Sequence, residues 1–121
     1  MDTIEKVFLS DLILKGIPYR PQATGLYFKV TEVGVCACAM GSAMEGAAGE
    51  YQNTKEYDTH SYDMLIDAIG YDPQLQIAPE TLCWHFNVYL SCTVFDVITY
   101  MNDHLRKTRE EIAAVLKEHG L

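Results

Sequence analysis

Residues 35–50, VCACAMGSAMEGAAGE, decide how the helices of this chain can pack. Small side chains dominate the run, and alanine recurs every four residues at Ala39, Ala43 and Ala47. Residues four apart share one face of an α-helix, so this face is nearly flat and a second helix can approach it closely. We expect a helix over residues 36–47, with Gly49 just past its end.

The four cysteines of the chain raise a second interpretation of the same run. Cys36 and Cys38 lie within it, and Cys83 and Cys92 come later. Residues two apart on a regular helix point about 200° apart, so Cys36 and Cys38 could not bind one ion together. A metal or redox site would therefore have to combine one of them with Cys83, His85 or Cys92. Cysteine is more often a small buried residue, so we favour packing and expect no bound metal and no cofactor.

Length and charge limit the classes of protein that the chain can be. Its 121 residues, 49% hydrophobic and 21% charged, predict a single domain over residues 1–121. Seventeen acidic residues against nine basic ones give a formal net charge of −8. Such a charge repels phosphate backbones and anionic lipid surfaces. We therefore expect neither nucleic acid nor a membrane as a partner.

The N-terminal residues bear on localisation. The first sixteen, MDTIEKVFLSDLILKG, contain charged residues among the apolar ones and lack the uninterrupted apolar region of a signal peptide. No apolar stretch is long enough to cross a bilayer. We expect a cytoplasmic protein, whose cysteines are thiols or ligands rather than disulfides.

Helical spacing of apolar residues predicts several further helices. The first runs to Gly16, and another covers residues 62–69. After Thr93 the apolar residues follow an amphipathic pattern: Val94, Val97, Ile98, Met101 and Leu105. Thr108 and Glu111 have the spacing of a capping box and predict the start of the last helix. The last two helices are expected to form a hairpin.

Two segments have the pattern of strands. Residues 26–30 are short and rich in β-forming side chains, and residues 82–90 alternate strictly between apolar and polar. We expect a two-stranded element from these segments. On such a strand Cys83 and His85 would share one face, and Cys92 would lie on the other.

The triplet Asn102, Asp103 and His104 is a further candidate site, for general acid or base chemistry or for a hard cation. Its place near a helix end suggests a structural role instead. Asn tolerates the left-handed conformation, and Asp can cap nearby amides. We favour the turn interpretation.

Two short motifs carry a resemblance to a known group. They are CAMGSA, residues 38–43, and VITYMNDHLRKTREEIAAVL, residues 97–116. The matching positions are Cys38, Ala39, Gly41, Ala43, Asn102, Asp103, Thr108, Arg109, Glu110, Ile112 and Ala113. With these motifs the chain resembles a group of small uncharacterised bacterial proteins, a domain of unknown function. Met40 and Met101 stand where leucine is usual in the group. The resemblance implies a bacterial source and supplies no catalytic residues.

Together these patterns predict a mainly α, compact small helical domain with a C-terminal helix hairpin and a short two-stranded element. The leading functional hypothesis is a non-catalytic interaction or regulatory module that binds a protein partner or self-associates as a homodimer. The alternative is a thiol-based metal-binding or redox protein that uses Cys36 or Cys38 with Cys83, His85 or Cys92. A weaker third hypothesis is a ligand binder or enzyme that uses Asp103 and His104.

Overall fold

The computed structural model describes residues 7–19, 21–23, 28–31, 34–49, 59–85 and 92–121. These residues are mainly α-helical, which confirms the predicted fold class. The helices are α1 (Leu9–Gly16), α2 (Ala39–Ala48), α3 (Thr59–Ile69), α4 (Glu80–His85), α5 (Val94–Thr99) and α6 (Arg109–Glu118). A 3₁₀ turn, Ile17–Tyr19, follows α1, and a π-helical turn, Tyr100–His104, follows α5. In this part of the chain no helix is both long and apolar enough to cross a membrane.

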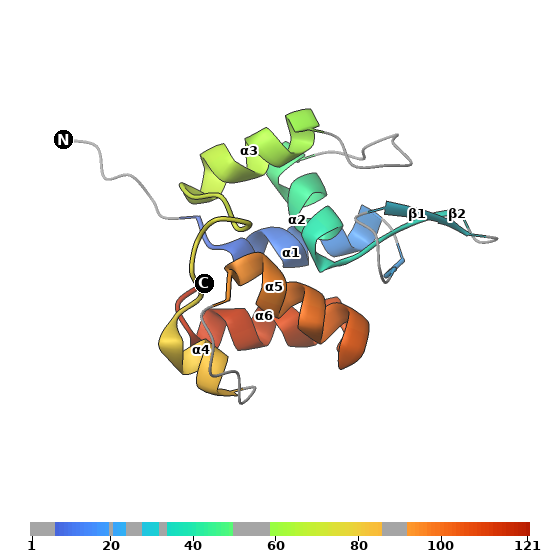
Figure 1. Ribbon diagram of the computed structural model, residues 1–121. Coiled ribbons are helices and arrows are strands. Elements are labelled where there is room, and N and C mark those ends of the chain that lie inside the picture. Colours follow the sequence, from blue (N-terminus) through green and yellow to red (C-terminus); the bar gives the residue numbers. More distant parts are fainter. Residues whose placement is uncertain (1–6, 20, 24–27, 32–33, 50–58, 86–91) are drawn as a thin grey trace.

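Helix α1 lies at the centre of the molecule, with α2 and α3 on one side and α5 and α6 on the other (Figure 1). The core is a single cluster to which these helices all contribute. Its largest fully buried apolar side chains are Leu9, Ile13, Met40, Met44, Leu65, Leu82, Ile98, Met101, Ile112 and Leu116. The packing of α2 and α6 therefore depends directly on the position of α1.

Two glycines allow the backbones of α1 and α2 to lie in direct contact. A Cβ atom added to Gly16 would lie 1.8 Å from the carbonyl oxygen of Ser42, and one added to Gly46 would lie 2.0 Å from that of Leu12. The side chains of Ala39 and Ala43 are completely buried. The close helix approach predicted for residues 35–50 is thus present, and glycine makes it possible where even alanine could not.

Helix α2 begins later than the sequence predicted. The prediction placed its start at Cys36, but residues 34–37 form strand β2 (Gly34–Ala37), which pairs antiparallel with β1 (Phe28–Thr31). The backbone of Ala37 is also bonded on both sides to residues 21–23, because its N–H donates to Pro21 and its carbonyl accepts from Ala23. These bonds require extended backbone. The end of the helix is as predicted, since Gly49 adopts the left-handed conformation at φ 74°.

The strand predicted for residues 82–90 is wrong where the structure describes it. Residues 80–85 form α4, and the rest of the predicted strand lies outside the described residues. The N–H groups of Leu82 and Cys83 both donate to the carbonyl of Pro79, which starts the helix. Helix α4 has only six residues, and the apolar pattern of so short a segment does not distinguish a helix from a strand. Strand β1 pairs with β2 instead.

The amphipathic helix after Thr93 is present but changes form. Thr93 and Asp96 make a reciprocal capping box at the start of α5. The last turn is π-helical, so the N–H of Leu105 donates to Tyr100, five residues earlier. The wider turn moves Leu105 off the buried stripe, and its side chain is 41% exposed. The first four residues of the predicted stripe are buried: Val94, Val97, Ile98 and Met101.

The capping box of the last helix is confirmed. The Thr108 hydroxyl accepts from the Glu111 N–H at 3.1 Å, and the Glu111 carboxylate accepts from the Thr108 N–H at 2.9 Å. The Thr108 N–H, and after it the Thr108 side chain, bond to the Glu111 carboxylate and lower the pKa of this carboxyl group below its ordinary value. The box satisfies two amides at the start of α6 that the helix itself leaves without a partner.

Replacement of Thr108 with alanine is expected to lower the free energy of unfolding by about 0.5–2 kcal/mol, because the Glu111 amide loses its acceptor. The fold should remain intact. Urea unfolding followed by circular dichroism measures the effect, with Thr108→Ser as the matched control that keeps the hydroxyl. A midpoint for Thr108→Ala equal to that of the wild type would contradict the capping role.

Candidate functional site

The structure places the two neighbouring cysteines in different elements. Cys36 lies on β2, where its Cα is paired with that of Lys29, and its side chain lies outside the described part. Cys38 occupies the N-cap position of α2 in extended conformation. Neither lies within a regular helix, so the helical argument about their relative directions does not apply to the folded chain.

The Cys38 thiol is shielded rather than activated. Burial raises its pKa to about 11, and the amides of Gly41 and Met40 at the start of α2 oppose the shift only in part. The charge of Asp103 raises the pKa further. A protonated thiol of this kind is a poor nucleophile and a poor metal ligand at neutral pH.

Asn102 connects three segments that are far apart in the sequence. Its side chain is 2% exposed and makes four hydrogen bonds. The carbonyl oxygen accepts from Gln22 at 3.0 Å and from the Ala39 N–H at 3.2 Å, while the amide nitrogen donates to the Ala23 carbonyl and to Asp103, both at 2.8 Å. Asn102 therefore ties the π turn to the start of α2 and to residues 21–23.

The other two residues of the predicted triplet do not point the same way. Asp103 is partly buried beside Asn102, whereas His104 is exposed, with its ring centroid 5.6 Å from that of Tyr100. The conformation predicted for Asn102 is wrong, because the left-handed residue of this connection is Arg106, at φ 52°. The triplet is divided between the interior and the surface and does not converge on one point.

A second buried polar link joins α6 to α2. Arg109, one of the residues that carry the resemblance, is 6% exposed, and its guanidinium donates to the Ser42 hydroxyl at 2.7 Å. Ser42 also lies at the close crossing with α1. This contact links the last helix to α2 within the interior of the protein.

Cys83 and Cys92 form the one pair of thiols that the described residues bring into contact. Their Sγ atoms are 3.3 Å apart, in a thiol–thiol hydrogen bond. Both are free thiols in this structure. A disulfide bond is about 2.05 Å long, so the two sulfurs would need to approach by only about 1 Å to form one.

Two consecutive residues hold the backbones of this pair in place. The Ala78 N–H donates to the carbonyl of Cys92 at 2.8 Å, and the next residue, Pro79, accepts from the N–H of Cys83 at 3.1 Å. The Thr81 hydroxyl, also on α4, is 3.0 Å from Nδ1 of His119 near the end of α6. The short contact between the sulfurs is therefore supported by main-chain hydrogen bonds on both sides.

The environment of Cys92 acts on the ionisation of its thiol. The pKa of the Cys92 thiol is raised to about 11, first by desolvation and then by the hydrogen bond to Cys83 and the negative charges of Cys83 and Asp96. Cys92 is therefore protonated at neutral pH. The small thiolate fraction makes exchange of the pair with a disulfide slow, although the thiolate that does form is strongly nucleophilic.

The predicted combinations of Cys36 or Cys38 with Cys83, His85 or Cys92 are not seen as one site. His85 is the last residue of α4, and its side chain lies outside the described residues. Among the side chains that are described, no group of three or more His, Cys, Asp or Glu residues could hold a metal ion. The metal-binding interpretation stays a prediction.

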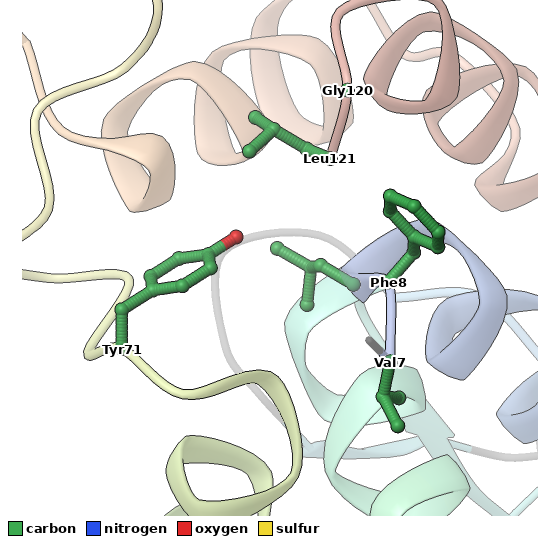
Figure 2. A pocket seen from close by; sticks show the side chains of 6 residues that line it. Val7, Phe8, Tyr71, Gly120 and Leu121 are labelled. Carbon is green, nitrogen blue, oxygen red and sulfur yellow. The ribbon is translucent and has the colours of Figure 1, made fainter. Parts of the chain in front are cut away.

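A small cavity between α1, the residue after Gly70 and the end of the chain is a second candidate (Figure 2). Its volume is about 20 Å³, and its lining residues are Val7, Phe8, Leu9, Tyr71, Gly120 and Leu121. The Tyr71 hydroxyl is buried without a hydrogen-bond partner among the described residues, and burial raises its pKa. The space is about the size of one water molecule and is too small for a cofactor.

No protein-family model matches the chain, and no match is found among curated proteins or solved structures. The resemblance to small uncharacterised bacterial proteins therefore stays a prediction. The candidate site rests on the geometry of Cys83 and Cys92 alone.

Proposed function

We propose that the chain is a regulatory module whose state is set by a reversible disulfide between Cys83 and Cys92. The observation that carries the proposal is the distance of 3.3 Å between the two sulfur atoms. The proposal joins the regulatory hypothesis to the thiol-redox alternative, but with a different pair of cysteines. It assumes the cytoplasmic location expected from the sequence, where thiols are normally reduced and oxidation acts as a signal.

The hydrogen bonds around Cys92 suggest how the redox state would be transmitted. Residues 76–78 are bonded to residues 92–94, because Val94 donates to Gln76 and Ala78 donates to Cys92. A disulfide would link α4 covalently to this pair of segments. Oxidation would then hold the loop at residues 72–78 more firmly against the start of α5.

The same loop carries the most exposed large apolar side chain among the described residues. Leu75 is 77% exposed and Ile77 is 52% exposed. In the proposal, a protein partner or a second copy of the chain binds this loop. The redox state of the thiol pair controls the mobility of the loop. The module needs no catalytic step of its own.

A redox titration of the wild-type protein tests the proposal. The protein is equilibrated in buffers of reduced and oxidised glutathione, and the remaining thiols are alkylated and counted by mass. We expect two thiols to be lost together, with a midpoint between about −320 and −180 mV, the range of cellular thiol pools. Hydrogen exchange at the Ala78 and Val94 amides should become slower on oxidation.

The matched control is Cys83→Ser, which keeps the size of the side chain but cannot form the bond. It should lose the two-thiol transition and the change in hydrogen exchange. A wild-type protein that keeps both Cys83 and Cys92 reduced at every potential in this range would contradict the proposal.

A further inference from the structure

The two sulfurs of the pair differ in their access to solvent. Cys83 lies on the inner side of α4 and is 7% exposed, as part of the core cluster. Cys92 packs against the edge of this cluster and is partly exposed. Thiol–disulfide exchange requires the attacking sulfur to reach a sulfur of the other molecule. Of the two sulfurs of this pair, only that of Cys92 offers such an approach.

We infer that Cys92 is a modification site for low-molecular-weight disulfides of the glutathione type, and that Cys83 is the thiol that resolves the product. This inference rests on the proposed function, since it assigns separate roles to the two members of the same pair. It makes the module a sensor of the ratio of small disulfides to small thiols.

The two steps balance as thiol–disulfide exchange. The Cys92 thiolate attacks one sulfur of glutathione disulfide, so a bond forms between Cys92 and glutathione, and one glutathione thiolate leaves. The Cys83 thiolate then attacks the Cys92 sulfur, the Cys83–Cys92 bond forms, and the second glutathione leaves as a thiolate. Each departing thiolate takes up a proton from water, and the two protons lost by the protein thiols balance them. The protein is oxidised by two electrons, and glutathione disulfide is reduced to two glutathione molecules.

The second step is favoured by the position of Cys83. Its sulfur is already 3.3 Å from the sulfur that it must attack, so the step is intramolecular and needs only a small movement. The mixed disulfide should therefore be short-lived in the wild type. Removal of the resolving thiol should make it accumulate.

Single-cysteine replacements test these roles with glutathione disulfide as the probe. In Cys83→Ser we expect a stable adduct of one glutathione on Cys92, located by peptide mapping. In Cys92→Ser we expect Cys83 to be modified at least tenfold more slowly under the same native conditions. Circular dichroism checks that each variant is folded, and Cys83→Ala replaces Cys83→Ser if the hydroxyl disturbs the core.

The results separate this inference from the proposed function. If the wild type forms the Cys83–Cys92 disulfide but Cys83 is modified as fast as Cys92 in the two variants, the assignment of roles is wrong and the proposed function stands. If the wild type forms no such disulfide, the proposed function fails. A stable adduct on Cys92 in Cys83→Ser, together with only a transient adduct in the wild type, is the result that the inference predicts.

Discussion

Replacement of Gly46 with alanine is expected to lower the free energy of unfolding by about 3 kcal/mol or more, because the new methyl group has no space. The added Cβ would lie 2.0 Å from the carbonyl oxygen of Leu12 on α1. A backbone atom is not free to move aside as the end of a side chain is, so the two helices must separate. Urea unfolding followed by circular dichroism measures the loss.

Helix propensity makes this test a strict one. In an exposed helix interior, alanine is more stable than glycine by about 0.8–1 kcal/mol, so propensity alone predicts the opposite sign. Gly120→Ala is the control, because its Cβ would meet nothing within 4 Å and only the left-handed backbone at φ 82° opposes the change. Its cost should be about 1–2 kcal/mol. A Gly46→Ala protein more stable than the wild type would contradict the close crossing of α1 and α2.

Replacement of Asn102 with alanine is expected to cost about 2–4 kcal/mol, because it leaves several polar groups in the interior without a partner. The Ala39 N–H would lose its acceptor, and the Ala23 carbonyl would lose its donor. Ala39 and Ala23 lie 63 and 79 residues from Asn102 in the sequence, so both hydrogen bonds connect distant segments of the chain. The loss should therefore appear in global unfolding, measured by urea denaturation.

The control for this prediction lies two residues away, in the same π turn. His104 is exposed, so His104→Ala should change the stability by no more than about 0.5 kcal/mol. Equal effects of the two replacements would show that the turn matters and the buried hydrogen bonds do not. An Asn102→Ala protein as stable as the wild type would contradict the structural role of Asn102 outright.

Local signals in the sequence predicted part of the fold well. The capping box of Thr108 and Glu111 depends on residues three apart, and the end of α2 depends on Gly49 alone. The flat face of α2 was also predictable, because it follows from the spacing of small residues. The start of α2 was not, because the extended backbone of Ala37 is held by bonds to residues 21–23, which no local pattern reveals.

The candidate site was harder to predict for the same physical reason. Alternation over residues 82–90 favoured a strand, and a strand would have placed Cys83 and Cys92 on opposite faces. In the structure Cys83 lies on a helix whose start is set by Pro79, and Cys92 is held by Ala78. The contact between the sulfurs therefore depends on hydrogen bonds that Ala78 and Pro79, both outside the segment from Cys83 to Cys92, make with the two cysteines. Pro79, just before the segment, was the signal that could have indicated a helix start.

The most direct measurement for the proposed disulfide is a peptide map of the wild-type protein after oxidation by glutathione disulfide. No Lys or Arg lies between Cys83 and Cys92, but Trp84, Phe86 and Tyr89 do, so chymotrypsin can separate the two cysteines where trypsin cannot. After alkylation of the remaining thiols, we predict one pair of peptides linked through Cys83 and Cys92, which separates when the sample is reduced. Alkylated Cys83 and Cys92 in the oxidised sample, with no linked pair, would contradict the account.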